Sequence, residues 1–253
     1  MSRLVSRREL AIGGLSAAGG AAGLLAAARI AKRYGLIPPD WRGKWGPGET
    51  LTYACQRLLT SPRSMAREFP RSQISKVAPV SGRPPAHGLY QDLLAARFID
   101  WRLSIDGMVA RPLSFSLADL RRFPARSQIT EQACEAGWSF IAEWTGVPLS
   151  HLMNLVGVLP RARYAVFFPF DKGWDSLDIE DAWHPQTLIA YAMNGQDLSP
   201  DHGAPARVKI PRQLGYKNVK FLARVSFTDT LKNIGKGLGS YAPEHGYSWY
   251  AGI

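Results

Sequence analysis

The sequence predicts an α+β fold of mixed β-sheets with short helices, and three observations support that class. Apolar and polar residues alternate over 101–106 and again over 219–228, which is typical of strands with one buried face. Ser116 and Ser150 are suitable N-caps for short helices. The run 164–168 is apolar throughout, as in a buried strand. Strands with short helices inserted between them are typical of the α+β class.

The first half of this core, from residue 97, contains one predicted strand and two predicted helices. The strand over 101–106 ends at Asp106-Gly107, which is a turn signal. A short helix is expected from its N-cap Ser116 through Phe123. A second helix is expected to open at Ser150 and to bury one apolar face, formed by Leu152, Leu155 and Val156.

The second half of the core is expected to be richer in strands. After the buried strand at 164–168, residues 188–193 form an apolar run that ends at Asn194-Gly195, a strong hairpin signal. The alternation over 219–228 predicts a half-buried strand near the C-terminal end. The core therefore extends to the end of the chain, over residues 97–253.

Two segments precede this core. Ser6-Arg7-Arg8-Glu9-Leu10 precedes residues 11–28, which contain eight Ala, five Gly, three Leu, one Ile and one Ser. A paired arginine before such a run predicts a twin-arginine export signal over 1–28, recognised by the twin-arginine export machinery. An ordinary secretory signal and an uncleaved anchor helix are the alternatives. Residues 29–96 are rich in Pro and Arg, and we expect an extended lead segment that wraps over the core.

Composition excludes several classes of protein. The apolar fraction is 46% and the charged fraction 20%, so a folded core is expected. The net charge is +11. The first 33 residues contain six basic residues and one acidic residue, so the rest of the chain has a net charge of +6. No long Lys/Arg block occurs, so nucleic acid is not an expected partner. Two cysteines are too few for a disulfide framework or a cysteine metal cage. The five histidines do not occur at the sequence spacings that are typical of zinc ligands.

Three separated stretches carry the chemical signal. They begin with Cys134-Glu135-Ala136-Gly137-Trp138-Ser139, continue with the run from Tyr191 through His202-Gly203-Ala204-Pro205-Ala206-Arg207, and end with Gly215-Tyr216-Lys217-Asn218-Val219-Lys220. Together and in this order they resemble the molybdopterin domain of the sulfite oxidase family, over about residues 64–250. The resemblance implies the sulfite-oxidase-type fold and a molybdenum-molybdopterin cofactor.

The resemblance also implies roles for individual residues. Cys134 matches the cysteine that binds molybdenum, and a thiolate is a soft donor suited to such a metal. Tyr247 matches an active-site tyrosine whose O–H could donate to a metal-bound oxygen or pass a proton. The positions that match cofactor-binding residues are Arg67, Glu68, His202, Arg207, Asn218, Val219 and Lys220. Pro169 departs from the sulfoxide-reducing members of the family, which carry a hydroxyl residue there.

Plainer interpretations of these residues remain open from the sequence. Cys134 could be a buried free thiol or pair with Cys55, which matches nothing in the family. His202 alone is typical of a satisfied surface histidine, and Lys220 alone of a solvated strand lysine. Tyr247 could belong to an aromatic packing cluster. The joint order of the motifs favours the cofactor interpretation.

The expected reaction is a two-electron oxygen-atom transfer at molybdenum, preferably reduction of a small-molecule or protein-bound S-oxide or N-oxide. The chain ends soon after the cofactor domain, so we expect a separate electron-transfer partner, either a membrane cytochrome b subunit or a soluble cytochrome c. The export signal implies the periplasm, with membrane association through an uncleaved N-terminus or a membrane partner. One alternative is a sulfite dehydrogenase, for which Arg67, Arg212 and Lys217 could form a cationic pocket. The other is a cofactor-free exported binding protein.

Overall fold

The computed structural model describes residue 29, residues 35–59 and residues 63–253. The predicted twin-arginine signal or anchor over 1–28 therefore lies outside the described residues. Within the described residues, no helix is long and apolar enough to cross a membrane.

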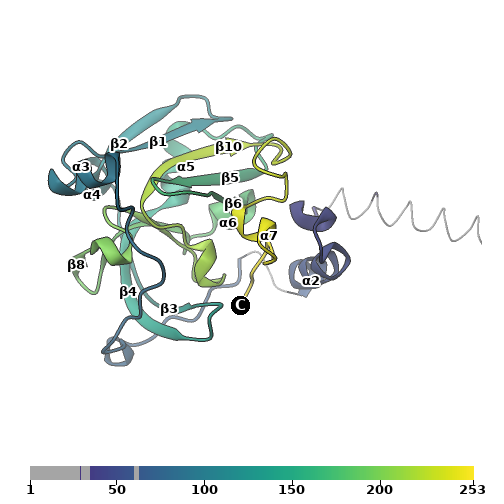
Figure 1. Cartoon of the computed structure of the whole chain (residues 1–253), viewed down its shortest axis with the longest axis horizontal. Helices are drawn as coiled ribbons and strands as arrows, with labels where there is room; N and C mark the ends of the chain where they lie inside the picture. Colours follow the sequence, from purple (N-terminus) through teal and green to yellow (C-terminus); the bar gives the residue numbers. More distant parts are fainter. Residues whose placement is uncertain (1–28, 30–34, 60–62) are drawn as a thin grey trace, which may run out of the picture.

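Two sheets form the body of the protein (Figure 1), and each of them has five strands. The first has the order β2-β1-β10-β5-β6, and its one parallel pair is β1 with β10. The second has the order β3-β4-β7-β8, with β9 also pairing with β7. The strands of the first sheet are β1 (Arg102–Gly107), β2 (Leu113–Ser116), β5 (Tyr164–Pro169), β6 (Asp175–Asp178) and β10 (Leu222–Thr228). Those of the second are β3 (Arg126–Ala133), β4 (Ser139–Pro148), β7 (Leu188–Met193), β8 (Gln196–Asp197) and β9 (Arg207–Lys209).

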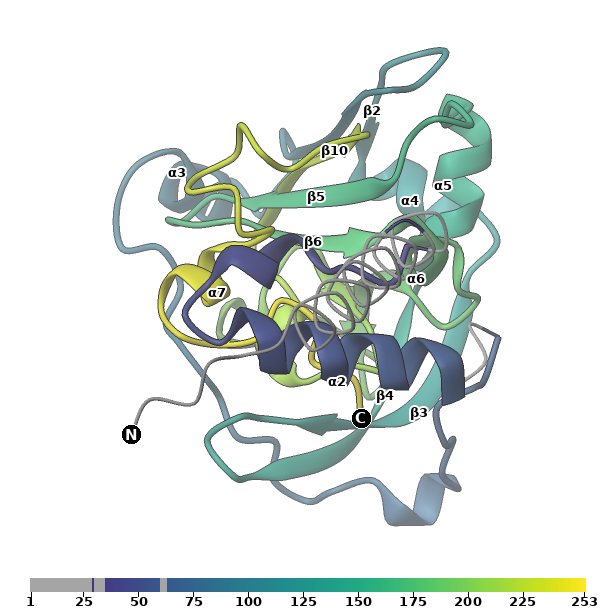
Figure 2. The ribbon, with the colours of Figure 1, turned by 90° about the vertical axis from the view of Figure 1, so that its right-hand side faces the viewer.

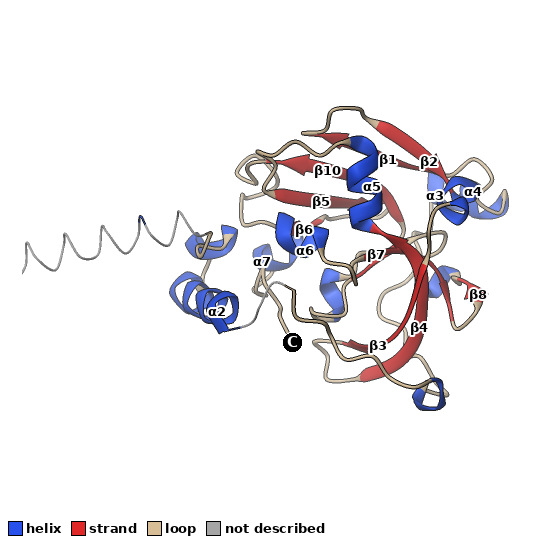
Figure 3. Ribbon diagram, turned by 180° about the vertical axis from the view of Figure 1, so that it is seen from behind, coloured by secondary structure: helices blue, strands red, loops and turns tan. Residues whose placement is uncertain are grey.

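The helices are short and lie around the sheets, as Figure 3 shows. The α-helices are α2 (Gly46–Leu59), α3 (Leu89–Ala95), α4 (Leu117–Arg122), α5 (Leu149–Val156), α6 (Ile179–Trp183) and α7 (Tyr241–Glu244). The 3-10 helices are η1 (Pro39–Arg42), η2 (Arg71–Gln73), η3 (Pro200–His202) and η4 (Gly215–Lys217). The predicted α+β class of mixed sheets with short helices is confirmed.

Several local predictions are confirmed because nearby residues decide them. Ser116 caps α4 through a capping box, in which its hydroxyl accepts from the Asp119 backbone N–H at 3.0 Å. Asn194 and Gly195 both have positive φ, at 52° and 76°, and join β7 to β8 as a hairpin. The predicted strand over 101–106 is also confirmed as β1. A contact across 121 positions holds its start to β10, because the fully buried Trp101 donates its indole N–H to the Leu222 carbonyl at 3.0 Å.

One predicted segment and two predicted boundaries differ from the structure. The 14-residue helix α2 interrupts the lead segment, which was expected to be extended, because no proline occurs between Pro47 in its first turn and Pro62. Helix α5 begins at Leu149 rather than with Ser150 as its cap. Strand β10 begins only at Leu222, because Phe221 before it has a φ of 53°, which a continuing strand does not accept.

Helix α2 packs against the C-terminal segment, as Figure 2 shows. Tyr53 is buried and meets the rings of Trp249 and Tyr250 edge-on, at centroid distances of 5.8 and 5.1 Å. Arg57 forms ion pairs with Asp178 and Asp181 at the end of β6 and in α6. The lead segment and the C-terminus therefore hold each other in place on one side of the first sheet.

Candidate active-site pocket

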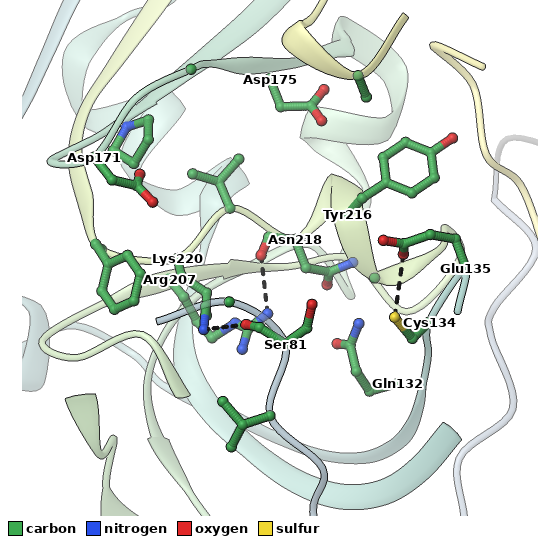
Figure 4. Close-up of a pocket in the computed structure, with 18 of the residues that line it drawn as sticks. Ser81, Gln132, Cys134, Glu135, Asp171, Asp175, Arg207, Tyr216, Asn218 and Lys220 are labelled. Carbon is green, nitrogen blue, oxygen red and sulfur yellow. Dashed lines mark hydrogen bonds between the residues drawn. The ribbon is translucent and has the colours of Figure 1, made fainter. Parts of the chain in front are cut away.

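A pocket of about 410 Å³ brings together residues that are far apart in the sequence. Its walls come from residues 79–83, the loop after β3, residues 169–175, η3, η4 and the segment around α7. Figure 4 shows Cys134 and Glu135 on one side of this pocket and Lys220 and Arg207 on the other.

Cys134 directly follows β3 and sits in a tight loop between β3 and β4. Its backbone N–H donates to the Trp138 carbonyl at 2.8 Å, and its carbonyl accepts from Gly137, whose φ of 88° suits glycine. The thiol is 8% exposed and lies 3.4 Å from a carboxylate oxygen of Glu135. Burial raises the pKa of the Cys134 thiol, and the Glu135 carboxylate adds to the effect. A metal that bound this sulfur would displace its proton.

Arg207 lies in β9 and is buried on the opposite side of the pocket. Its guanidinium donates to the carbonyls of His202 and Asn218, at 3.0 Å each. Burial lowers the pKa of Arg207 to about 10. No described carboxylate lies within ion-pair distance of Arg207. A buried cation without a counter-ion is costly, so this arrangement suits an anionic ligand.

Lys220 and His202 lie beside Arg207 on this side of the pocket. The ammonium of Lys220 donates to the carbonyls of Ser81 and Asp201, at 2.6 and 2.8 Å. Burial and then Arg207 lower the pKa of Lys220 to about 8. The same two causes lower the pKa of His202, and a hydrogen bond with the Ala78 backbone opposes the shift. Gly203 allows η3 to lie against Lys220, because a Cβ there would be 2.9 Å from the lysine Cβ.

These donors fit a phosphorylated cofactor. The backbone N–H groups of Val219 and Lys220 donate to no other described residue, so they are available to an anion beside the lysine ammonium. Asn218 holds the segment in shape: its side-chain oxygen accepts from the Ile210 backbone N–H at 2.7 Å, and its side-chain nitrogen donates to the Leu214 carbonyl at 3.1 Å.

Seven of the nine predicted site residues line this one pocket, namely Cys134, His202, Arg207, Asn218, Val219, Lys220 and Tyr247. Tyr247 is 49% exposed, and its ring lies 5.5 Å from that of Tyr216. The structure does not bring Arg67 and Glu68 to the pocket. Their segment pairs with the edge of β3 through the bridge between Glu68 and Thr130. The Glu68 carboxylate also forms an ion pair with Arg126 at 2.5 Å.

The structure also decides two alternatives that the sequence left open. The cationic cluster that sulfite would require does not form from Arg67, Arg212 and Lys217, none of which lines the pocket. Lys217 is buried in an ion pair with Asp175, and Arg212 lies 3.4 Å from Asp181. The structure shows Cys55 and Cys134 as free thiols, with Cys55 exposed on α2, so they are not a disulfide.

Sequence reasoning missed other residues of the pocket. They include Ser81, Gln132, Glu135, Asp171, Asp175 and Tyr216. Gln132 belongs to β3 and points to the pocket beside Cys134, but the polar run of that strand gave no reason to select it. Ser81 lies in the lead segment, which had been interpreted only as a wrap. Its contact with Lys220 spans 139 positions of sequence, so no local signal could have found it.

The chain matches the family described as "Oxidoreductase molybdopterin binding domain" over residues 91–233. The chain belongs to this family. It is therefore a molybdopterin-binding oxidoreductase of the sulfite oxidase family, as the sequence motifs predicted. The family match includes the motifs at Cys134, Arg207 and Lys220.

Similar proteins include enzymes of sulfur chemistry. A candidate protein-methionine-sulfoxide reductase subunit, YedZ1, of Azospira oryzae is 32% identical over 78% of this chain and 71% of its own length. The methionine-sulfoxide reductase catalytic subunits MsrP of Campylobacter jejuni and Ralstonia nicotianae are 28% and 31% identical, over 61% and 51% of this chain. The chain spans only 57% and 44% of those two relatives. The crystal structure of sulfane dehydrogenase SoxCD from Paracoccus pantotrophus matches with a TM-score of 0.50 and 30% identity, over 52% of this chain and 39% of that one.

Proposed function

We propose that this chain is the catalytic chain of a periplasmic molybdenum reductase whose substrates are S-oxides, with protein-bound or free methionine sulfoxide as the leading candidate. The observation that carries the proposal is the pocket itself, in which a buried thiol faces Arg207 and Lys220, neither of which forms an ion pair with a described carboxylate. The methionine-sulfoxide reductase names of its relatives support the substrate class.

In this proposal each side of the pocket has its own task. Cys134 ligates molybdenum through its deprotonated sulfur. Arg207, Lys220 and the free N–H groups at Val219 and Lys220 bind the phosphate end of the pterin. Asn218 keeps that segment in shape, and His202 lies at the lining of the pocket, where its backbone carbonyl accepts from Arg207.

When bound, the cofactor supplies the two-electron redox chemistry for removing the oxygen of an S=O group. The overall reaction consumes one S-oxide, two electrons and two protons, and yields one thioether and one water. Tyr247 lies at the pocket lining and is half exposed, so its O–H can hydrogen-bond the departing oxygen and pass it a proton. Tyr216 packs against Tyr247 and is itself anchored by donation to the Ser248 carbonyl at 2.7 Å.

The two electrons come from a separate protein, which we propose to be a membrane cytochrome b subunit. The description of one relative as a reductase subunit supports a multi-protein enzyme. The paired arginines Arg7-Arg8 support export in the folded state.

The experiment that tests this function begins with protein that is expressed with its predicted export signal, residues 1–28, and purified from the periplasm. Molybdenum is measured by mass spectrometry and pterin by the fluorescence of its oxidised form. Reduction of free and protein-bound methionine sulfoxide is then followed with an artificial electron donor. The paired variants are Cys134→Ala and Cys55→Ala, since Cys55 is an exposed thiol of the same chain far from the pocket.

We expect near one molybdenum per chain, turnover of methionine sulfoxide and loss of turnover in Cys134→Ala alone. Full activity of Cys134→Ala with an unchanged metal environment would refute the assignment of the ligand. Reduction of the metal by sulfite, without turnover of S-oxides, would favour the sulfite dehydrogenase alternative. Absence of molybdenum and pterin from a cofactor-producing host would favour the binding-protein alternative.

A further inference from the structure

Lys209 is a buried lysine that the proposed chemistry does not use. It lies in β9, two residues after Arg207, and is fully buried. Its ammonium donates to the Glu131 carbonyl at 3.0 Å and to the side-chain oxygen of Gln132 at 2.8 Å. No described carboxylate forms an ion pair with it. Such a costly group is expected to have a defined task.

The contact with Lys209 decides which way the Gln132 amide faces. A lysine only donates hydrogen bonds, so its partner atom on Gln132 must be the carbonyl oxygen Oε1. The amide nitrogen Nε2 is then turned to the other side. Gln132 is 5% exposed and lines the pocket, and no described residue accepts a hydrogen bond from Nε2.

The free Nε2 lies beside the proposed metal ligand. A Cβ added to Gly215 would be 2.9 Å from Gln132 Nε2 and 3.5 Å from the Cα of Cys134, so both groups border the same small space. Figure 4 shows the amide nitrogen of Gln132 on the side of the Cys134 sulfur. A donor on a nearly buried side chain that has no protein partner and faces a pocket is a binding group for an acceptor atom.

We propose that Lys209 and Gln132 form a positioning pair that presents a fixed amide N–H to the electron-rich sulfur or oxygen atoms gathered around Cys134. This inference rests on the proposed function, because those atoms belong to the metal group that Cys134 would bind. Lys209 acts only through Gln132: without it the amide is free to rotate and to offer its oxygen instead.

The physical consequence is a shift in redox equilibrium. A hydrogen bond to a ligand atom withdraws electron density from the metal and stabilises the reduced form, so it raises the reduction potential. Burial lowers the pKa of Lys209 strongly. The orientation of the amide is imposed by the protonated form of Lys209, because a neutral amine could also accept a hydrogen bond from Nε2.

The test is a redox titration of the molybdenum in the purified holoprotein, followed by electron paramagnetic resonance. The variants are Gln132→Leu, Gln132→Glu, Lys209→Met and the double variant Lys209→Met/Gln132→Leu. Lys232→Met, which alters an exposed lysine, is the control. Lys209→Arg keeps a donor to Oε1 and should rescue the wild-type potential.

We expect Gln132→Leu and Lys209→Met each to lower the reduction equilibrium constant about tenfold, which is about 59 mV for a one-electron couple. The double variant should shift no further than Gln132→Leu, because the two residues act as a unit. Gln132→Glu keeps the contact with Lys209 but removes the N–H, so it should shift as Gln132→Leu does. Two results would refute the proposed pair: single variants whose reduction potentials are unchanged at full metal content, or a double variant whose shift equals the sum of the two single shifts. Absence of molybdenum from the wild type would instead overturn the proposed function, and the pair with it.

Discussion

Lys220 should set the upper pH limit for holding the cofactor. Its pKa is lowered to about 8, first by burial and then by Arg207, while Asp171 and Asp201 oppose the shift. Only the protonated lysine attracts a phosphate strongly. The phosphate of a bound pterin is already ionised above pH 7, and the pKa of His202 is lowered, so neither group adds a transition in the alkaline range.

The size of the effect follows from the titration of one group. With a pKa of about 8, Lys220 is protonated in about nine-tenths of the molecules at pH 7 and about one-tenth at pH 9. A bound anion raises the pKa of the lysine, so binding takes up a proton above pH 8 and weakens as the pH rises. The affinity should therefore fall about tenfold between pH 7 and pH 9. Arg207, with a pKa of about 10, contributes only above that range.

The assay measures the fraction of chains that keep pterin after dialysis at pH 7, 8 and 9. Lys220→Met should lose about tenfold to a hundredfold in affinity at pH 7, since a hydrogen bond to a charged group is worth about 1.5–3 kcal/mol, and should show no further loss up to pH 9. Lys232→Met, on an exposed lysine, should behave as the wild type. Equal retention at pH 7 and 9 in the wild type, or the same pH profile in Lys220→Met, would refute the reasoning.

Three further predictions concern the reaction, the stability and the export of the chain. Tyr247→Phe should lower kcat on the order of 100-fold with unchanged molybdenum content, because it removes a proton donor; an unchanged kcat would assign Tyr247 to packing. Lys217→Met should lower the free energy of unfolding by about 3–5 kcal/mol in urea titrations, because it leaves Asp175 buried without its cation. Replacing Asp175 by Leu as well should recover most of that loss, and failure to recover would contradict the charge argument. Changing Arg7 and Arg8 to Lys should keep the protein in the cytoplasm, as cell fractionation would show; continued export would point to an ordinary secretory signal.

The elements that were predicted correctly are those that short-range forces decide. The capping box at Ser116 closes within three residues, and the hairpin at Asn194-Gly195 needs only two residues that tolerate positive φ. The missed helix α2 shows the opposite case. Its stability depends on Tyr53 packing under Trp249 and on Arg57 reaching β6 and α6, and those partners are over a hundred residues away.

The candidate site divides in the same way. Motifs with fixed spacing were enough to nominate Cys134, Arg207 and Lys220, because the residue type alone shows that each offers a thiol or a cationic group. Arg67 and Glu68 matched a motif too, but their segment pairs with the outer edge of β3 and lies outside the pocket. Sequence similarity could not reveal this. A segment without a regular hydrophobic pattern follows whichever strand edge is free to pair with it, and the sequence does not show which edge that is.

The sequence by itself determined the α+β class and the family, and it nominated the candidate site residues, because hydrophobic period, turn residues and side-chain type are local properties. Only the tertiary structure decided which of those residues meet. It brought Ser81 to Lys220 and Lys209 to Gln132, contacts that span 139 and 77 positions. It also removed Lys217 from the pocket by pairing it with Asp175. The physical reason is that a buried charge must find a partner within a few ångströms, and only the packing of the two sheets determines which group lies there.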